Sequence, residues 1–213
     1  PDYVSIYTQN SNTDYPFCNS IKNGDIVVDV SLREELLHID ITADATPVKY
    51  ISLRWNFTEF EKRRENVKVF GDVWERGYGD LEWRGIVPDR MMPWVCAISN
   101  GSDQNRNFCG RYTECFGVKT APNAMCMWQY DTAGLTLWLD VRSGGMGVVL
   151  QGRTLSVCDV LFGDYRDISA FDALKDYYKC LCDAPLTVDH KVYGTNNWYY
   201  AYGKTSHDEI LED

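Results

Sequence analysis

"DIVVDVSLREELLHIDITADATPVKYISLRWNF" (residues 25–57) contains three apolar runs that are separated by short polar breaks. In the middle run, residues 36–43, leucine and isoleucine alternate with polar residues. Alternation with a period of two is typical of a strand that has one face in the core and the other in solvent. The stretch therefore predicts consecutive antiparallel strands over 25–32, 36–43 and 48–57.

Strand-like runs with the same character continue as far as Gly163. They occupy 94–99, 115–120, 124–131, 135–142, 147–152 and 154–163. Turn residues recur roughly every ten residues, as expected for a large sandwich of antiparallel strands. The fold class that we predict is mainly β, with a large antiparallel β-sandwich (supersandwich) over 1–165.

The periodicity changes after the predicted sandwich. "ISAFDALKDYYKCLCD" (168–183) has helical spacing with Ser169 as its N-cap, so we assign 166–190 to a helical connector and linker. In 191–213, a strand-like run at 192–195 precedes a capping box that starts at Ser206. A parallel strand needs neighbours, so 191–213 is interpreted as the start of a further, incomplete α/β domain.

The charge balance excludes several classes of partner. The chain has 21 basic and 31 acidic residues, a net charge of −10. A nucleic-acid surface needs clustered lysine and arginine, and an anionic membrane attracts the same residues. No apolar run reaches the roughly 18 to 20 residues of a membrane span. We therefore expect no nucleic acid and no membrane, and a neutral partner. No signal peptide is visible, and the compartment, cytoplasmic or secreted, stays open.

Neither the cysteines nor the histidines form a recognisable metal or catalytic motif. Cys180-x-Cys182 has no second pair, so we expect no metal and no cofactor. A loop disulfide between Cys109 and Cys115 stays open. The three histidines are scattered and fall in no Ser-His-Asp pattern. Motifs for nucleotide phosphates and for a nucleophile elbow are missing from the sequence.

The segment "GDVWERGYGDLEWRG" (71–85) brings carboxylates and aromatic rings together. Aromatic rings cover the apolar face of a sugar and carboxylates accept bonds from its hydroxyls, so Trp74 and Glu75 are candidate sugar contacts. Glu75 and Glu82 are the pair that retaining hydrolysis would require. The structural alternative is equally compatible with the sequence: ion pairs hold the loop, and its tryptophans, Trp83 among them, anchor it in the core.

Several stretches together resemble a known family. They are "FGDVWERGYGDLEWRG", "MMPWVCAIS", "FGVKT", "LTLWLDVRSGG", "VLQGRTL" and "VYGTNNWYYAYGKTS", in this order. The chain resembles the N-terminal region of melibiase-type, α-galactosidase-like glycoside hydrolases of family 36. The resemblance implies a β-supersandwich, a helical connector and then the first βα unit of a truncated (β/α)8 barrel.

The resemblance also implies which residues contact the sugar. The run 192–195 would be the first barrel strand, and Asn196 would follow it at the barrel face that holds active sites. Asn197 and Trp198 match the Asn-Trp motif that lines the galactose pocket in the family. Tyr199 stands where the family often has an acidic residue, which leaves the recognised sugar open.

The family's catalytic nucleophile lies in a Lys-x-Asp stretch, and this chain has none. The resemblance therefore implies catalytic aspartates outside this chain, and a 213-residue piece that is inactive by itself. We expect a non-catalytic N-terminal region of a hydrolase for α-linked galactosides or related sugars, with homo-oligomer contacts through the sandwich. The alternatives are a stand-alone carbohydrate-binding sandwich, which needs an exposed aromatic platform, and a purely structural module.

Overall fold

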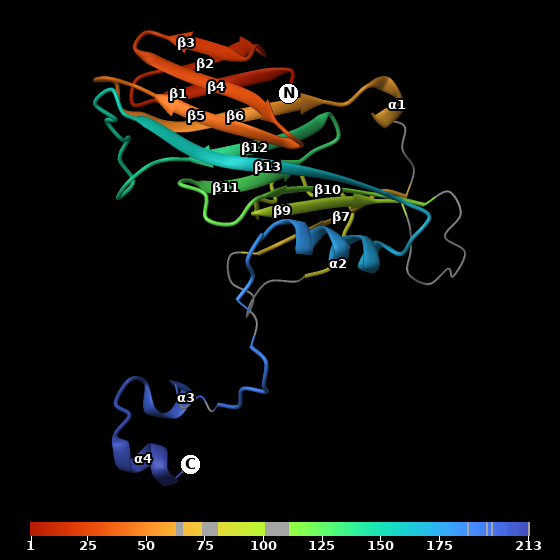
Figure 1. Ribbon diagram of the computed structural model, residues 1–213, viewed down its shortest axis with the longest axis vertical. Coiled ribbons are helices and arrows are strands. Elements are labelled where there is room, and N and C mark those ends of the chain that lie inside the picture. The colour runs from red at the N-terminus through yellow and green to blue at the C-terminus, as the bar shows by residue number, and fades with distance from the viewer. Residues whose placement is uncertain are drawn as a thin grey trace. The chain divides into compact units, whose positions relative to one another are not determined.

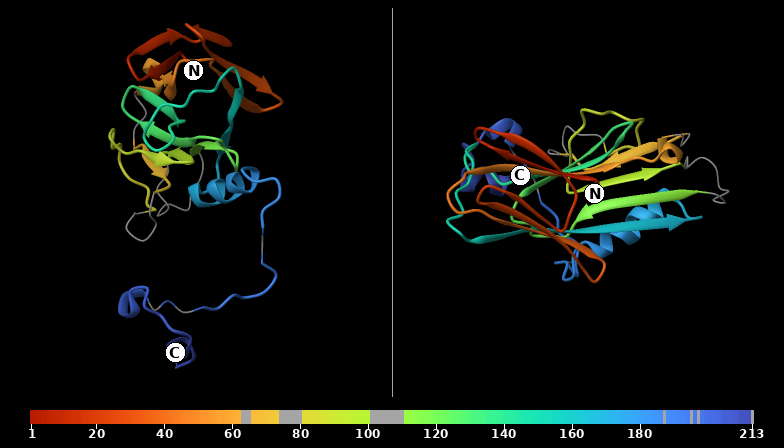
Figure 2. Two further views of the ribbon diagram at one scale, coloured as in Figure 1. Left: turned by 90° about the vertical axis from the view of Figure 1, so that its left-hand side faces the viewer. Right: turned by 90° about the horizontal axis from the view of Figure 1, so that it is seen from above.

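The structure is a computed structural model that describes residues 1–62, 66–73, 81–100, 111–186, 188–194, 196 and 198–212. These residues form two compact units, Pro1–Asp183 and Ala184–Asp213. Every strand of the described residues belongs to the first unit, in which two sheets face each other (Figures 1 and 2). All strand pairs are antiparallel.

One sheet has six strands in the order β2-β1-β6-β12-β11-β8. Its strands are β1 (Tyr3–Thr8), β2 (Asn12–Pro16), β6 (Val48–Asn56), β8 (Met92–Pro93), β11 (Met125–Tyr130) and β12 (Gly134–Asp140).

The other sheet has seven strands in the order β3-β4-β5-β13-β10-β9-β7. Its strands are β3 (Ser20–Asn23), β4 (Ile26–Arg33), β5 (Leu36–Thr42), β7 (Lys68–Gly71), β9 (Val95–Ser99), β10 (Tyr112–Val118) and β13 (Thr154–Arg166). The 13-residue β13 lies in the middle of this sheet and pairs with both β5 and β10.

The core lies between the sheets, and strands such as β4 and β11 bury every second residue in it. Ile39 of β5 and Ile51 of β6 are fully buried, as is Trp128 of β11, whose indole N–H donates to the Trp94 carbonyl at 3.1 Å.

The fold class predicted from the sequence, mainly β with two large antiparallel sheets, is confirmed. Strands β4, β5 and β6 agree with the runs predicted from 25–57. The run predicted at 147–152 is different: apart from an isolated bridge between Val148 and Val48, it has no strand pairing.

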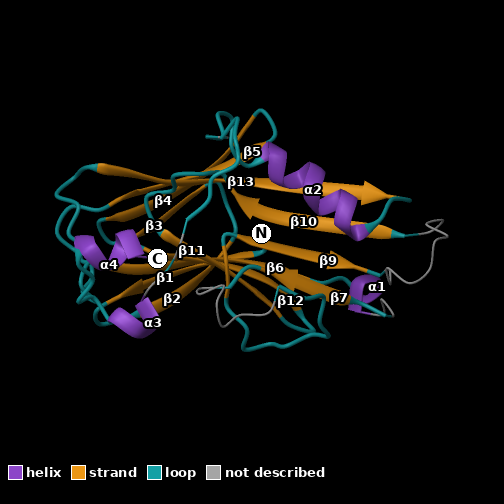
Figure 3. Ribbon diagram, turned by 90° about the horizontal axis from the view of Figure 1, so that it is seen from below, coloured by secondary structure: helices purple, strands orange, loops and turns teal. Residues whose placement is uncertain are grey.

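Helix α2 (Ala170–Cys180) covers the outer side of β10 and β13 (Figure 3). Ser169 is its N-cap, as predicted, and accepts from the Asp172 N–H at 3.0 Å. The Tyr177 hydroxyl reaches the sheet and donates to the Leu161 carbonyl at 2.7 Å. A Cβ on Gly117 would lie 2.6 Å from that hydroxyl, so glycine there allows the close approach. This helix, which we assigned to the connector 166–190, lies within the first compact unit.

The second unit contains two short helices, α3 (Trp198–Ala201) and α4 (His207–Glu212). The predicted capping box is present: Glu209 accepts from the Ser206 N–H at 2.9 Å, and Ser206 Oγ accepts from the Glu209 N–H at 3.3 Å. The strand predicted at 192–195 is not formed over Val192–Gly194. A strand requires hydrogen-bonded neighbours, and the described residues of this unit include no strand. The start of a barrel in 191–213 stays a prediction.

Candidate functional site

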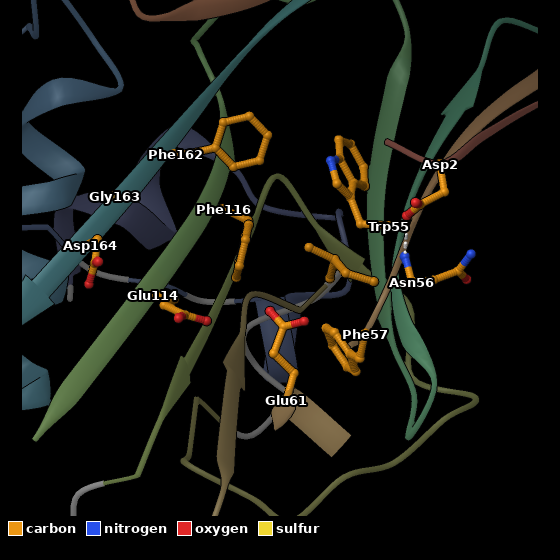
Figure 4. Close-up of a pocket in the computed structure, with 11 residues that line it drawn as sticks. Asp2, Trp55, Asn56, Phe57, Glu61, Glu114, Phe116, Phe162, Gly163 and Asp164 are labelled. Carbon is orange, nitrogen blue, oxygen red and sulfur yellow. Dashed lines mark hydrogen bonds between the residues drawn. The ribbon is translucent and has the colours of Figure 1, made fainter. Parts of the chain in front are cut away.

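A pocket of about 400 Å³ opens at one end of the sandwich, where strands of both sheets meet α1 (Glu59–Lys62). We call it the end pocket. It is lined by Asp2, Trp55, Asn56, Phe57, Glu61, Glu114, Phe116, Leu135, Phe162, Gly163 and Asp164 (Figure 4). Pockets that bind small molecules are mostly apolar with a few placed polar groups, and this lining has that composition.

Three of the four aromatic rings in the lining of the end pocket come from facing strands of the two sheets. Trp55 comes from β6 of one sheet, whereas Phe116 and Phe162 are cross-strand partners on β10 and β13 of the other. The ring centroids of Trp55 and Phe162 are 5.9 Å apart, and those of Phe116 and Phe162 are 6.0 Å apart, both edge-to-face. Phe162 is 42% exposed, so a ring face is available to a ligand.

The position of Trp55 is fixed by a glycine on the neighbouring strand. Gly134 of β12 lies so close that a Cβ there would be 2.1 Å from the Trp55 carbonyl oxygen. Next to it, Asp131 accepts two bonds from Arg54, at 2.7 and 2.8 Å. These bonds hold the pKa of Asp131 below its usual value. The β11–β12 turn is therefore tied to the end of β6, next to the pocket.

Carboxylates lie around the aromatic rings. Figure 4 shows Glu61 of α1 and Glu114 of β10 pointing into the same space. Glu61 is oriented by the N-cap of α1, because its Oε2 accepts from the Thr58 N–H at 2.7 Å. Arg166 Nη2 lies 2.7 Å from Asp164 and 3.8 Å from Glu114. Carboxylate oxygens are acceptors only, so they suit a ligand rich in hydroxyl or other donor groups.

The predicted sugar contacts are either outside the described residues or in the second unit. Trp74, Glu75 and Asn197 lie outside the described residues. Asn196 and Trp198 are brought together, because Asn196 Oδ1 accepts from the Trp198 N–H at 2.9 Å. Trp198 is 57% exposed and Tyr199 is 76% exposed. The role of Asn196, Trp198 and Tyr199 in sugar binding stays a prediction.

The described ends of the 71–85 segment have structural contacts. Trp83 packs on Phe70 with ring centroids 5.5 Å apart, and Arg84 lies 4.0 Å from Glu82. These contacts agree with the structural interpretation of Glu82, Trp83 and Arg84. Asp72 is buried and lines a second pocket of about 390 Å³ between β9, β10 and the end of α2.

His38 belongs to a polar cluster that the sequence did not predict. It lies on the outer face of β5, yet it is only 7% exposed. Its Nδ1 is 2.5 Å from Asp159, and its Nε2 is 3.0 Å from Asp40 and 3.3 Å from the Ser156 hydroxyl. A nucleophilic serine needs a base nitrogen directed to its hydroxyl, whereas this nitrogen lies closer to a carboxylate. The cluster is therefore a partly buried hydrogen-bond network around His38.

The described residues give no indication of a metal site, and burial keeps two of their thiols protonated. They contain no group of three or more histidine, cysteine or acidic side chains that could hold a metal ion. Burial raises the pKa of the Cys115 thiol to about 12 and that of Cys96 further. Cys109, the other end of the disulfide considered above, lies outside the described residues. Within the described chain, no helix is long and apolar enough to span a membrane.

No protein-family model matches the chain, and no curated protein or solved structure matches it either. The resemblance to α-galactosidase-like hydrolases therefore rests on the sequence motifs, and function has to be argued from the pocket.

Residues of the end pocket were missed because they are far apart in the sequence. The alternation of β10 and β13 is visible in the sequence, but the pairing of Phe116 with Phe162 depends on register. The capping box Thr58-x-x-Glu61 was the one local signal available.

Proposed function

We propose that this chain is the non-catalytic N-terminal region of an α-galactosidase-like retaining glycoside hydrolase, and that its sandwich binds carbohydrate in the end pocket. The observation that carries the proposal is the combination of exposed aromatic surface at Phe162 with carboxylates from α1, β10 and β13. Sugars have an apolar C–H face and a rim of hydroxyl donors, and this lining offers a partner for both.

The two sheets contribute different parts of the proposed site. Trp55 lies on β6 of the six-stranded sheet, and Asp2 directly precedes β1 of that sheet. Phe162 and Glu114 lie on β13 and β10 of the seven-stranded sheet. The packing of Trp55 on Phe162 across the two sheets supports a pocket that is formed before a ligand binds. A preformed site avoids part of the ordering cost of binding, which matters for a weakly bound neutral ligand.

The experiment is isothermal titration calorimetry of the purified chain with melibiose, a neutral α-galactoside. We expect saturable binding with a Kd on the order of 1 mM, about −4 kcal/mol. Removing the Phe162 ring should weaken binding about fivefold, equivalent to about 1 kcal/mol. Leu32→Ala is the matched control, because Leu32 is 72% exposed on β4 and does not line the pocket.

Two results would contradict sugar binding in the end pocket. One is a wild-type chain that gives no binding heat with melibiose. The other is Phe162→Ala binding melibiose as tightly as the wild type and the Leu32→Ala control.

The same preparation tests the catalytic part of the proposal. Since the family's Lys-x-Asp stretch is missing from the sequence, the chain should not hydrolyse nitrophenyl α-galactoside. Steady turnover by the chain, at a rate proportional to its concentration, would show that catalytic groups lie within it.

The second candidate function is a stand-alone carbohydrate-binding sandwich. It is favoured by the fact that the end pocket is built from described residues of the first unit alone. It predicts the same binding of melibiose and requires no catalytic partner domain.

A further inference from the structure

The outer face of the six-stranded sheet carries a row of aromatic side chains. Tyr7 on β1 is the cross-strand partner of Tyr50 on β6, and their ring centroids are 6.1 Å apart. Tyr7 also lies 5.5 Å from the ring of Trp138 on β12. Their neighbours in sequence, such as Ile6 and Ile51, are buried in the core, so these rings face away from it.

A fixed pair of charges lies at one side of these rings. Arg142 Nε is 3.0 Å from Asp140 Oδ1, and Arg142 Nη2 is 2.8 Å from Asp140 Oδ2. The guanidinium carbon lies 4.4 Å from the centroid of the Tyr50 ring. The two charges offset each other, and among the described residues that line this surface they are the only charged ones. The surface therefore suits an uncharged ligand.

This aromatic surface is part of a groove with two hollows. The first, of about 590 Å³, contains the rings together with methionines such as Met127. The second, of about 470 Å³, extends past Asn123 and Pro122. Met125 and the Asp140–Arg142 pair line both hollows, so the two are adjacent. Two adjacent hollows have room for a chain of linked units instead of one compact ligand.

The groove is also rigid where a ligand would touch it. The Trp138 indole N–H donates to Gln129 Oε1 at 2.9 Å, and the Gln129 amide donates to the Pro88 carbonyl at 2.8 Å. Preorganised aromatic surface beside oriented donors and acceptors is typical of ligand sites.

We propose that this outer groove binds an uncharged oligosaccharide chain. One sugar packs on Trp138 and Tyr7, and the next places its hydroxyls against Asp140, Arg142 and Asn123. The choice of sugar as ligand rests on the proposed function, but the groove is a second site, separate from the end pocket. The groove would hold an extended glycan while the end pocket holds a shorter α-galactoside.

The test is affinity electrophoresis of the purified chain in native gels containing galactomannan, xyloglucan or arabinogalactan, which are neutral polysaccharides. We expect at least one of them to retard the wild type, and Trp138→Ala and Tyr7→Ala to lose at least fivefold in apparent affinity. Trp138→Phe, which keeps a ring, should retain most of the retardation. Near-ultraviolet circular dichroism checks that each variant is folded.

The matched control is Leu32→Ala, because Leu32 is exposed on β4 and lines neither the groove nor the end pocket, so this variant should be retarded like the wild type. Phe162→Ala is run beside it to separate binding in the end pocket from binding in the groove. Three results would overturn the inference: no polysaccharide retards the wild type, both groove variants are retarded normally, or only Phe162→Ala loses retardation. The last result would leave the proposed function in place. A concentration-dependent dimer that Trp138→Ala abolishes, without any retardation by sugar, would instead assign the groove to a second copy of the chain.

Discussion

Gly71 begins the 71–85 segment and lies against Met92 of β8. A Cβ at this position would be 2.2 Å from the Met92 sulfur and 2.7 Å from its Cβ. The Met92 side chain therefore leaves no room for a larger residue than glycine at position 71. Gly85, in the same segment, has nothing within 4 Å of such a Cβ.

Gly71→Ala should therefore destabilise the sandwich. Inserting a methyl group into a filled space costs about 1–3 kcal/mol. Urea unfolding followed by tryptophan fluorescence measures the loss. Gly85→Ala is the matched control and should leave the midpoint unchanged, and equal midpoints for the two variants would contradict the packing argument.

His38→Ala should destabilise the fold because Asp40 and Asp159 both lose their hydrogen bond to the imidazole, although Asp40 keeps its contact with Arg33. Losing a partly buried hydrogen bond costs about 1 kcal/mol. The control is His190→Ala, whose side chain is 74% exposed beside Asp189. Thermal unfolding at neutral pH should show a lower Tm for His38→Ala alone. If both variants melt at the wild-type temperature, the cluster contributes no stability.

At the scale of elements, Asp25 connects the start of β4 to the loop between β5 and β6. Its carboxylate accepts from the N–H groups of Asp44, Ala45 and Thr46, at 3.0, 2.6 and 2.9 Å, and from the Thr46 hydroxyl. The Thr46 hydroxyl bond, followed by the backbone bonds, holds the pKa of Asp25 far below its usual value.

This shift predicts a pH dependence. A carboxyl whose folded pKa is lowered stabilises the fold above its unfolded pKa and loses that contribution as the pH falls through the folded pKa. The Tm difference between wild type and Asp25→Asn should be constant from about pH 5 to pH 8 and shrink below about pH 4. Asp14→Asn, at an exposed position on β2, is the control. A difference that grows on acidification would contradict the assignment.

Elements with strong local patterns were predictable, and those that depend on distant partners were not. The alternation in 25–57 predicted β4 to β6, and Ser169 predicted the start of α2. Both signals are local, because the burial pattern of a strand and the capping of a helix depend on a few neighbouring residues. Strands β1 to β3 were not predicted; β2 has no fully buried position and is held by pairing with β1. At 192–194 the sequence predicted a strand that the structure does not contain. The apolar run there has no pairing partner among the described residues of its unit.

For the whole molecule, composition and alternation predicted the sandwich, but the candidate pocket required the tertiary fold. Trp55, Glu114 and Phe162 meet only because β6, β10 and β13 end at the same side of the two sheets. The predicted sugar contacts Trp74, Glu75 and Asn197 lie outside the described residues, so they stay predictions. The sequence motifs therefore favour carbohydrate as the class of ligand, and the lining of the end pocket is the basis for proposing where the sandwich binds it.

The most direct test of sugar binding in the end pocket is a titration of the 15N-labelled chain with melibiose, followed through the indole N–H signals of its seven tryptophans. Assignment by single Trp→Phe variants identifies each signal. We expect the Trp55 signal to move saturably with millimolar melibiose and to stop moving in Phe162→Ala, while the Trp138 signal stays in place. A Trp55 signal that does not respond, or a response confined to Trp198, would contradict the account.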